Sequence, residues 1–364
     1  MTIVADPPAP VDTPLEVTVG VDTHADTHVA AVIDPLGRHL AHASFGTTVA
    51  GYESLLEWAT RFGTISLVGV EGTGAYGAGL ARFLGTKELM VVEVDRPDRK
   101  TRRTEGKSDP IDAYAAARAA ASGRASGIPK ARTGDVESVR VLRVARTSAI
   151  RDRAKALTRL KALRVSAPDA LRAQLADLNN TKLVATCARL RPARHGGRLA
   201  DTTAATKRSM ASIAARIQAL TTEIADLDAD LEALLAPLAP TLLDLQGVGP
   251  DSAGQLLVTT GDNPSRIRNQ SAFAHLCGVA PIPASSGKTG NRHRLNRGGD
   301  RQANASLHRI VLCRLRWDPT TRAYVERRTQ EGLTKKEIIR CLKRFVAREV
   351  FAAIQTDLNP QHSP

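Results

Sequence analysis

Apolar runs alternate with helix-like spacings along the first third of the chain, which indicates a mixed α/β domain. Three apolar runs separated by short gaps predict strands joined by antiparallel hairpins. Two further runs predict strands that are separated by helices. The predicted strands cover 16–22, 27–33, 39–45, 65–70 and 89–94, and the predicted helices cover 52–62, 78–84 and 109–121.

The order of these elements decides between two kinds of α/β domain. Gly72, Gly74 and Gly77 form a G-x-G-x-x-G motif, and Asp95 lies where a dinucleotide-binding domain has its ribose-binding acid. In such a domain the glycines follow the first strand, whereas here they follow the fourth. Three hairpin-connected strands followed by two crossover units are the order of a ribonuclease H-like α/β domain. We therefore interpret the glycines as residues that permit a turn and close helix packing beside Glu71.

The pattern becomes helical over 136–235. Between Ile213 and Leu234 the apolar residues step by four and three alternately, which is the a/d pattern of a heptad. This pattern fits a helix packed in a local bundle as well as an intermolecular coiled coil. A break at 191–197 would turn the chain back and pair 136–163 with the later helix, which predicts a long helical hairpin.

A third region begins after the prolines at 237 and 240, and we expect it to be mostly α-helical. Gly247 and Gly249 in the segment LQGVGP resemble a helix-hairpin-helix turn, whose backbone amides can bind a phosphate. The predicted organisation is a loose tail at 1–15, a ribonuclease H-like domain at 16–130, a helical or coiled-coil region at 135–236, a C-terminal domain at 237–350 and a tail at 351–364.

Charge gives the first indication of function. The 364 residues carry a formal net charge of +14, and Lys and Arg far outnumber Asp and Glu over 264–348. Such a surface attracts nucleic acid or an anionic membrane, although a merely soluble basic protein also fits the charge. Aromatic residues make up only 3% of the chain, so phosphate contacts by arginine are expected to dominate over base stacking.

Cysteine spacing and hydropathy exclude other classes of protein. Cys187, Cys277, Cys313 and Cys341 show no C-x-x-C spacing, so neither a zinc site nor a disulfide framework is expected. No apolar run has the length of a membrane span, and the N-terminus lacks the features of a signal peptide. We therefore expect a cytoplasmic protein without a membrane partner.

Four acidic residues occur at the three positions where a ribonuclease H-like fold gathers carboxylates. Asp22 ends the first predicted strand, and Glu71 ends the fourth, which is its neighbour in such a fold. Asp109 and Asp112 lie three residues apart at the start of a helix, hence on one face, with Ser108 or Asp109 as the cap. Because converging carboxylates repel one another, this arrangement predicts a two-metal site that holds Mg²⁺, with Mn²⁺ as an alternative.

Each acid also has an ordinary structural interpretation. Asp22 alone suits the start of a turn, and Glu71 suits the residue before a tight turn. Asp109 suits a helix cap, and Asp112 a solvated acid in the first helical turn. The presence of all four at the expected places favours the metal site.

Longer segments resemble a known family of mobile-element proteins. The segments VGVDTHADTHVAAV, GVEGTGAYG, GKSDPIDAYAAARAA, LQGVGPDSAGQLL and FAHLCGVAPIPASSGKTGNRHRLNRGGDRQANASLHRIV make the chain, over about 16–350, similar to DEDD-type insertion-sequence transposases of the family usually called IS-one-ten. The resemblance implies a Ruv-like metal site at Asp22, Glu71, Asp109 and Asp112. It also implies a C-terminal transposase domain whose serine attacks DNA and forms a phosphoserine link.

The implied serine falls in the segment 278–287. Ser286, directly before Gly287, is the first choice, and Ser285 is the second because some relatives place a residue between serine and glycine. A serine in such a loop is a weak nucleophile unless a base, a metal or flanking cations assist it. A phosphate-binding loop without a covalent role therefore also fits. The cations expected to bind nucleic acid here are Lys288, Arg292, Arg294, Arg297 and Arg301.

These features together predict a DNA transposase or recombinase of a bacterial insertion sequence. The resemblance implies DNA at the element ends and target as substrate, a guide RNA and association with the nucleoid. Strand exchange between two duplexes calls for a homo-oligomer, either a dimer or a tetramer. Two other functions stay open, a Holliday-junction-type nuclease that uses water and a catalytically dead nucleic-acid-binding remnant.

Overall fold

The computed structural model describes residues 15–94, 108–285 and 293–359, which belong to two compact units. The first unit combines Met1–Gly134 with Thr260–Arg268, and the second combines Asp135–Thr259 with Asn269–Pro364. The chain therefore leaves the first unit, returns to it for a short segment and leaves it again. Asp95 lies outside the described residues.

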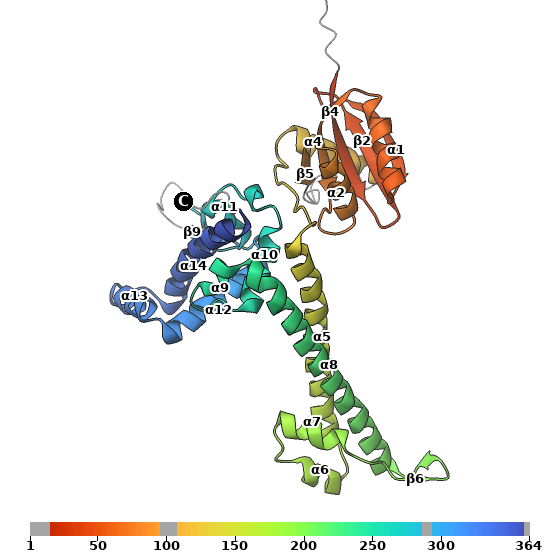
Figure 1. Ribbon diagram of the computed structural model, residues 1–364, viewed down its shortest axis with the longest axis vertical. Coiled ribbons are helices and arrows are strands. Elements are labelled where there is room, and N and C mark those ends of the chain that lie inside the picture. The colour runs from red at the N-terminus through yellow and green to blue at the C-terminus, as the bar shows by residue number, and fades with distance from the viewer. Residues whose placement is uncertain (1–14, 95–107, 286–292, 360–364) are drawn as a thin grey trace, which may run out of the picture. The chain divides into compact units, whose positions relative to one another are not determined.

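A five-stranded mixed sheet forms the centre of the first unit (Figure 1). The strands are β1 (Glu16–Thr23), β2 (Thr27–Ile33), β3 (His39–Gly46), β4 (Thr64–Glu71) and β5 (Val91–Val94). Their order is β3-β2-β1-β4-β5. β2 is antiparallel to β1 and β3, whereas β4 is parallel to β1 and β5. The predicted mixed α/β arrangement with ribonuclease H-like strand order is confirmed.

Helices cover both faces of this sheet. Alternation along β1 directs Val17, Val19 and Val21 to one face, where they pack with α1 (Val49–Thr60) and α2 (Ala78–Thr86). On the opposite face, α4 (Asp109–Ala121) packs against alternate residues of β2. The predicted bounds of α4 agree with the structure. Since side chains alternate, Asp22 and Glu71 lie on the face that α4 covers.

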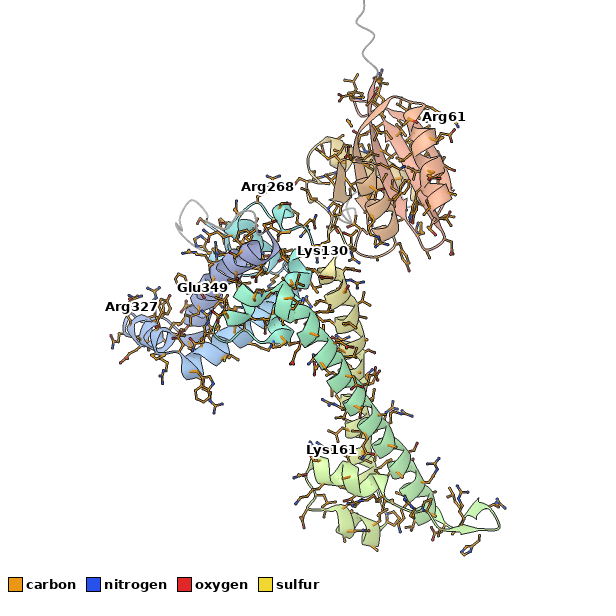
Figure 2. All side chains as sticks on the ribbon, viewed as in Figure 1. Arg61, Lys130, Lys161, Arg268, Arg327 and Glu349 are labelled. Atoms are coloured by element: carbon orange, nitrogen blue, oxygen red, sulfur yellow. The ribbon has the colours of Figure 1, made fainter. Side chains whose placement is uncertain are left out.

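Two long helices, α5 (Asp135–Val165) and α8 (Thr202–Leu238), lie side by side in the second unit (Figure 1). The chain turns back between them through α6 (Asp169–Leu175), α7 (Asn180–Ala188) and a small hairpin of β6 (Arg194–His195) and β7 (Arg198–Leu199). The predicted hairpin and its break are therefore present, with two additional short helices. These helices bury an apolar core against α5 and α8, and Lys161 lies on α5 at this end of the hairpin (Figure 2).

The predicted heptad pattern lies on α8, which packs along α5 of the same chain. Ile217, Ile224 and Leu231, spaced by seven residues, are buried, whereas Leu220 and Leu227 on the alternate positions are half-buried. One half of the pattern thus contributes to the local helix pair. An intermolecular coiled coil through the other half stays a prediction.

Short helices form the rest of the second unit, as predicted for a mostly α-helical region. They are α9 (Pro240–Asp244), α10 (Pro250–Thr260), α11 (Gln270–Leu276), α12 (Arg301–Trp317), α13 (Pro319–Gln330) and α14 (Lys335–Leu358). A hairpin of β8 (Pro281–Pro283) and β9 (His293–Leu295) lies between α11 and α12 in sequence.

The prediction of a tail from residue 351 is wrong for 351–358. α14 continues to Leu358, and Ala353 and Ile354 are buried, because the apolar face of this helix extends over its whole length. None of the helices in the described part of the chain combines the length and apolar character needed to cross a bilayer.

The segment Thr260–Arg268 is held in the first unit by side chains that bond to a distant stretch of backbone. Asn263 accepts a hydrogen bond from the backbone amide of Ala131 (3.0 Å) and donates one to the carbonyl oxygen of Pro129 (2.9 Å). Arg266 donates from Nε to the carbonyl oxygen of Ile128 (2.8 Å). These contacts explain why a segment inside the predicted C-terminal domain belongs to the N-terminal unit.

Candidate metal centre

Two adjacent strand ends position the first pair of predicted acids. β1 and β4 run parallel, and Val21 lies opposite Val70 in their register. The next residues are Asp22 and Glu71, so both acids occur at the same edge of the sheet. Asp22 is buried, with 7% of its surface exposed, and Glu71 is half-buried.

Helix α4 brings the second pair of acids to the same face. Its N-cap is Ser108, so Asp109 is the first helical residue rather than the cap. Pro110 occupies the first turn, where its missing amide hydrogen costs nothing. Asp109 is exposed, whereas Asp112 is 5% exposed and is therefore not the solvated acid that its position alone suggested.

Three side chains from these elements bring potential metal ligands together. His24 Nε2 lies 3.2 Å from Asp22 Oδ2 and 3.5 Å from Asp109 Oδ1. One ligand atom from each of Asp22, His24 and Asp109 lies within 4.8 Å of the others. Glu71 and Asp112 are not members of this group of three. His24 was not among the predicted site residues.

The electrostatics of Asp22 reflect a crowded, partly desolvated carboxylate. Burial raises the pKa of Asp22, whereas the charge and the hydrogen bond of His24 lower it. The negative charges of Asp112 and Asp109 raise the pKa further, so that it lies above its ordinary value. Asp112 therefore acts on Asp22 electrostatically, and added positive charge at this point would stabilise the ionised form.

The backbone around Glu71 is fixed by its neighbours. The hydroxyl of Thr23 donates a hydrogen bond to the carbonyl oxygen of Glu71 (2.9 Å), which ties the end of β1 to the end of β4. A Cβ on Gly77 would come within 2.7 Å of that same carbonyl oxygen, so only glycine fits there. This is the close packing beside Glu71 that the sequence suggested for the G-x-G-x-x-G motif.

The donor set fits a divalent cation. Carboxylate oxygens are hard ligands suited to Mg²⁺ and Mn²⁺, and the His24 imidazole adds a nitrogen donor that transition metals accept more readily than Mg²⁺. Burial and neighbouring negative charges raise the pKa of Asp22. The same unbalanced negative charges are the reason that the sequence predicts a cation at this site.

The predicted serine site lies in the second unit. Ser285 is exposed and follows β8, whereas Ser286, Lys288 and Arg292 lie outside the described residues. Three other predicted cations follow this segment, and all are exposed, with Arg294 on β9 and Arg301 at the start of α12. The third of these is Arg297.

The two glycines of the predicted helix-hairpin-helix turn join α9 to α10. A Cβ on Gly247 would come within 3.2 Å of the Ile310 carbonyl oxygen, so this glycine packs against α12. Gly249 is exposed and borders open space. The amide-to-phosphate contact suggested for this turn stays a prediction.

Two family models match the chain. Residues 19–165 match a model of DEDD transposases of the IS110 type, and residues 239–326 match a model described as transposase of the IS116/IS110/IS902 family. The first match includes all four predicted acids. The second begins shortly before the predicted hairpin turn and includes the segment of the predicted serine.

Proteins of two insertion elements are similar to the first part of the chain. The IS110 uncharacterized 43.6 kDa protein of Streptomyces coelicolor is 32% identical over 146 residues, which are 40% of this chain and 36% of that protein. The IS900 uncharacterized 42 kDa protein of Mycobacterium paratuberculosis is 28% identical over 137 residues, which are 37% of this chain and 34% of that protein. The matched part thus spans about a third of each relative. Since two models of the same family match its two separate regions, the chain belongs to the IS110 family of transposases.

Proposed function

We propose that this protein is the DNA transposase of an insertion element and that its N-terminal unit contains the metal-dependent part of the active site. The observation that carries the proposal is the approach of Asp22, His24 and Asp109 to within 4.8 Å. Buried Asp112 and the strand-end acid Glu71 lie on the same face of the sheet. A site of this charge is suited to the phosphodiester of a nucleic acid once a cation offsets its acids.

Asp22, His24 and Asp109 would hold the cation, and Glu71 and Asp112 would supply further negative charge for a second one. A bound divalent cation supplies positive charge that polarises a phosphodiester and stabilises the attacking and leaving oxygens. The residues themselves fix its position, since Thr23 ties the two strand ends together and α4 carries Asp109 and Asp112. The hydrogen bond between His24 Nε2 and Asp22 Oδ2 (3.2 Å) would give way to coordination when both atoms bind the cation.

The second part of the proposal assigns the nucleophile to Ser286, with Ser285 as the alternative. The serine Oγ forms a bond to phosphorus while the bond between phosphorus and one deoxyribose oxygen breaks, and that oxygen takes up a proton. A hydroxyl group of another strand then displaces the serine. The number of phosphodiester bonds is conserved, so no ATP is needed.

Nucleic acid and further copies of the chain are the proposed partners. The net charge of +14 supports binding to the element ends and target DNA, and to a guide RNA, through phosphate contacts. Exposed Arg294, Arg297 and Arg301 are placed to contribute such contacts beyond Ser285. A homo-oligomer would hold two duplexes together, and the half-buried positions of α8 offer one interface.

Incubation of the full chain with Mg²⁺, the element's end DNA and its flanking RNA tests both parts. Denaturing gels should reveal cleaved DNA together with a covalent protein–DNA adduct, and peptide mapping should locate the adduct on Ser286 or Ser285. Asp22→Asn should abolish cleavage and adduct. Ser209→Ala, at an exposed serine of α8, is the matched control and should retain both.

Other results would favour the two alternative functions. Cleavage without an adduct, unchanged in Ser285→Ala and Ser286→Ala, would identify a nuclease that uses water. Binding of DNA without any metal-dependent cleavage would identify a nucleic-acid-binding remnant.

A further inference from the structure

A pocket of about 560 Å³ lies in the second unit among β8, β9, α13 and α14. Its volume is typical of small-ligand pockets, which span roughly 300–1,000 Å³. None of its described lining residues is acidic. Figure 2 labels Arg327 on α13, one of six strongly basic lining residues. These six are Arg294, Arg327, Arg328, Arg340, Lys343 and Arg344.

The positive charge of the pocket is only partly balanced. Arg327 and Arg328 share one acid, Glu331, with Arg327 Nε 3.8 Å from Glu331 Oε1. For the other four cations, no ion pair with an acid occurs in the part of the chain that the structure describes. Lys343 Nζ instead donates a hydrogen bond to the neutral Asn304 side chain (2.9 Å). The pocket therefore retains an excess of positive charge.

Two nitrogen atoms of the pocket arginines also lack an acceptor among the described residues. Arg344 Nη1 and Arg328 Nε are buried without a hydrogen-bond partner among the described residues. The second terminal nitrogen of Arg344 reaches only a long contact of 3.5 Å to the Ser271 hydroxyl. Burial and the nearby Arg348 lower the pKa of Arg344. Each arginine of the lining carries five N–H donors, so the pocket is suited to a ligand with anionic oxygens.

Part of the remaining lining is apolar and aromatic, and His293 and Asn296 add two polar side chains. Val279, Ala280 and Pro281 form part of it, and Tyr324 and Phe345 contribute two rings whose centroids lie 5.7 Å apart at an angle of 86°. Exposed or half-buried aromatic rings next to cations are the surface on which proteins stack unpaired bases. An inorganic anion would leave this apolar part of the pocket without a ligand group.

We propose that this pocket binds one unpaired nucleotide of a DNA or RNA strand, with its base against Tyr324 and Phe345 and its phosphates on the surrounding cations. A paired base inside a duplex is stacked between its neighbours and cannot enter a pocket of this size. The inference rests on the proposed function in one respect, because that function identifies the strand as DNA of the element or target, or as guide RNA. Ser285 follows Pro281 by four residues, which places the pocket close in sequence to the proposed nucleophile.

Cysteine alkylation of the full chain tests the pocket without any substitution. Cys341 lines the pocket and is half-buried, whereas Cys313 is also half-buried but does not line it. Saturating 12-nucleotide single strands of DNA or RNA, added with EDTA, should slow alkylation of Cys341 about fivefold or more. Cys313 should react at an unchanged rate, and the same sequence as a duplex should give little protection.

Photocrosslinking identifies the contacting side chain and the source of the nucleotide. Single strands carrying 5-iodouracil, one of DNA and one of RNA, should crosslink to Tyr324 or Phe345, and peptide mapping should locate the bond. Crosslinking by the DNA strand alone would assign the pocket to DNA, and crosslinking by the RNA strand alone would assign it to the guide.

Substitutions provide matched comparisons. Tyr324→Leu should weaken single-strand binding about tenfold or more through lost stacking, and Arg294→Gln should weaken it through a lost phosphate contact. Arg322→Gln, at an exposed position of α13 outside the pocket, should bind as the unsubstituted chain does. Tyr76→Leu, at an exposed tyrosine of the first unit, is the control for the loss of a ring.

Equal protection of Cys341 and Cys313, equal protection by the duplex, or crosslinks that map outside the pocket would overturn the proposal. A glutamate-rich peptide that protects Cys341 as well as the single strands do would identify an acidic protein segment as the ligand instead. Because these measurements contain EDTA, they do not depend on the metal centre. If the unsubstituted chain cleaves DNA but single strands do not protect Cys341, the pocket proposal is wrong and the proposed function stands. If single strands protect Cys341 but the chain does not cleave DNA, the proposed function is wrong and the pocket proposal stands.

Discussion

Gly20 on β1 lies directly opposite Gly69 on β4, and α4 packs against the sheet at this pair. A Cβ on Gly20 would come within 2.1 Å of the Ala117 backbone nitrogen, and one on Gly69 within 2.8 Å of the Ala116 carbonyl oxygen. The two glycines therefore let the helix backbone contact the strands. Since Asp22 is two residues beyond Gly20, this contact sets how closely the acids of α4 approach it.

Gly20→Ala should displace α4 and destabilise the first unit. Overpacking of a filled core costs about 1–3 kcal/mol, and more when backbone atoms must move, so we expect a loss of about 3 kcal/mol or more, measured by urea unfolding. Gly85→Ala in α2 is the control, because no heavy atom lies within 4 Å of its added Cβ. It should stabilise the helix slightly. Equal unfolding midpoints for both variants would contradict the packing argument.

Metal ions should stabilise the protein through Asp22. With Mn²⁺ or Mg²⁺ the Tm of the unsubstituted chain should rise above its value in EDTA, because a ligand that binds only the folded state stabilises it. Asp22→Asn should lose most of this rise. In EDTA the variant should be at least as stable as the original chain, since a buried, repelled carboxylate has been removed.

The matched control for this measurement is Asp26→Asn. Asp26 is an exposed acid in the turn between β1 and β2, and it is not one of the three residues Asp22, His24 and Asp109. Its response to the metal should equal that of the unsubstituted chain. A metal-dependent rise that survives in Asp22→Asn would exclude Asp22 as a ligand.

His28 should make the stability of the first unit depend on pH. Its ring is fully buried, neither ring nitrogen has a hydrogen-bond partner among the described residues, and burial lowers its pKa. The unfolded chain takes up the proton near the ordinary pKa of about 6.5. The stability that neutral His28 permits is therefore present above about pH 6.5 and is lost as the pH falls toward the lowered pKa, by up to about 1.4 kcal/mol per pH unit.

Urea unfolding between pH 5 and pH 8 checks this expectation in the original chain and in His28→Leu. The variant should show a flatter profile, with the difference confined to the acidic side. Parallel profiles of the two proteins would show that His28 does not titrate as described.

Asp251 should stabilise the second unit by pairing with three arginines from two other helices. It accepts from Arg143 Nη1 (2.9 Å), Arg146 Nη1 (3.2 Å) and Arg309 Nη2 (2.8 Å). Burial alone would raise its pKa, but the three positive charges outweigh burial and lower it. Asp251→Asn should cost about 1–2 kcal/mol at pH 7, a value kept small because 40% of the side chain is exposed.

The sign of the pH effect follows from the lowered pKa. The stabilisation is present above the ordinary pKa of about 3.9 and is lost as the pH falls through the lower folded value, so the difference between Asp251→Asn and the original chain should shrink in acid. Asp244→Asn, at an exposed acid at the end of α9, should leave unfolding unchanged. A similar loss in both variants would point to general charge effects instead.

The sheet could be predicted because its strands alternate strictly and its connections are short. The same four-residue pattern of valine, glycine, valine and acid ends both central strands, at 19–22 and at 68–71. In the structure the valines face one core, the glycines admit α4, and the acids end at the site. Local sequence carries these features, since each depends only on alternation along a strand.

Other features depend on contacts that a pattern does not contain. His24 is close to Asp109 because α4 starts beside the end of β1, and the pattern of acids in the sequence does not include a histidine. α6 and α7 interrupt the helical region, with Pro168 and Asn179 at their N-caps. The apolar positions of α14 continue at helical spacing to Ile354, and this spacing is a signal of the helix that the sequence itself contains. The nucleophilic serine is predicted from the family resemblance alone, because its loop has no periodic pattern of apolar residues.

The bonds from Asn263 and Arg266 to the backbone at 128–131 have a consequence for how the protein is made. A ribosome has to synthesise both long helices, α5 and α8, before these two side chains emerge. The N-terminal unit is therefore completed late in translation, and a fragment ending at Gly134 would expose the Pro129 and Ile128 carbonyl oxygens to solvent. Shortened versions intended for purification should extend at least to Arg268.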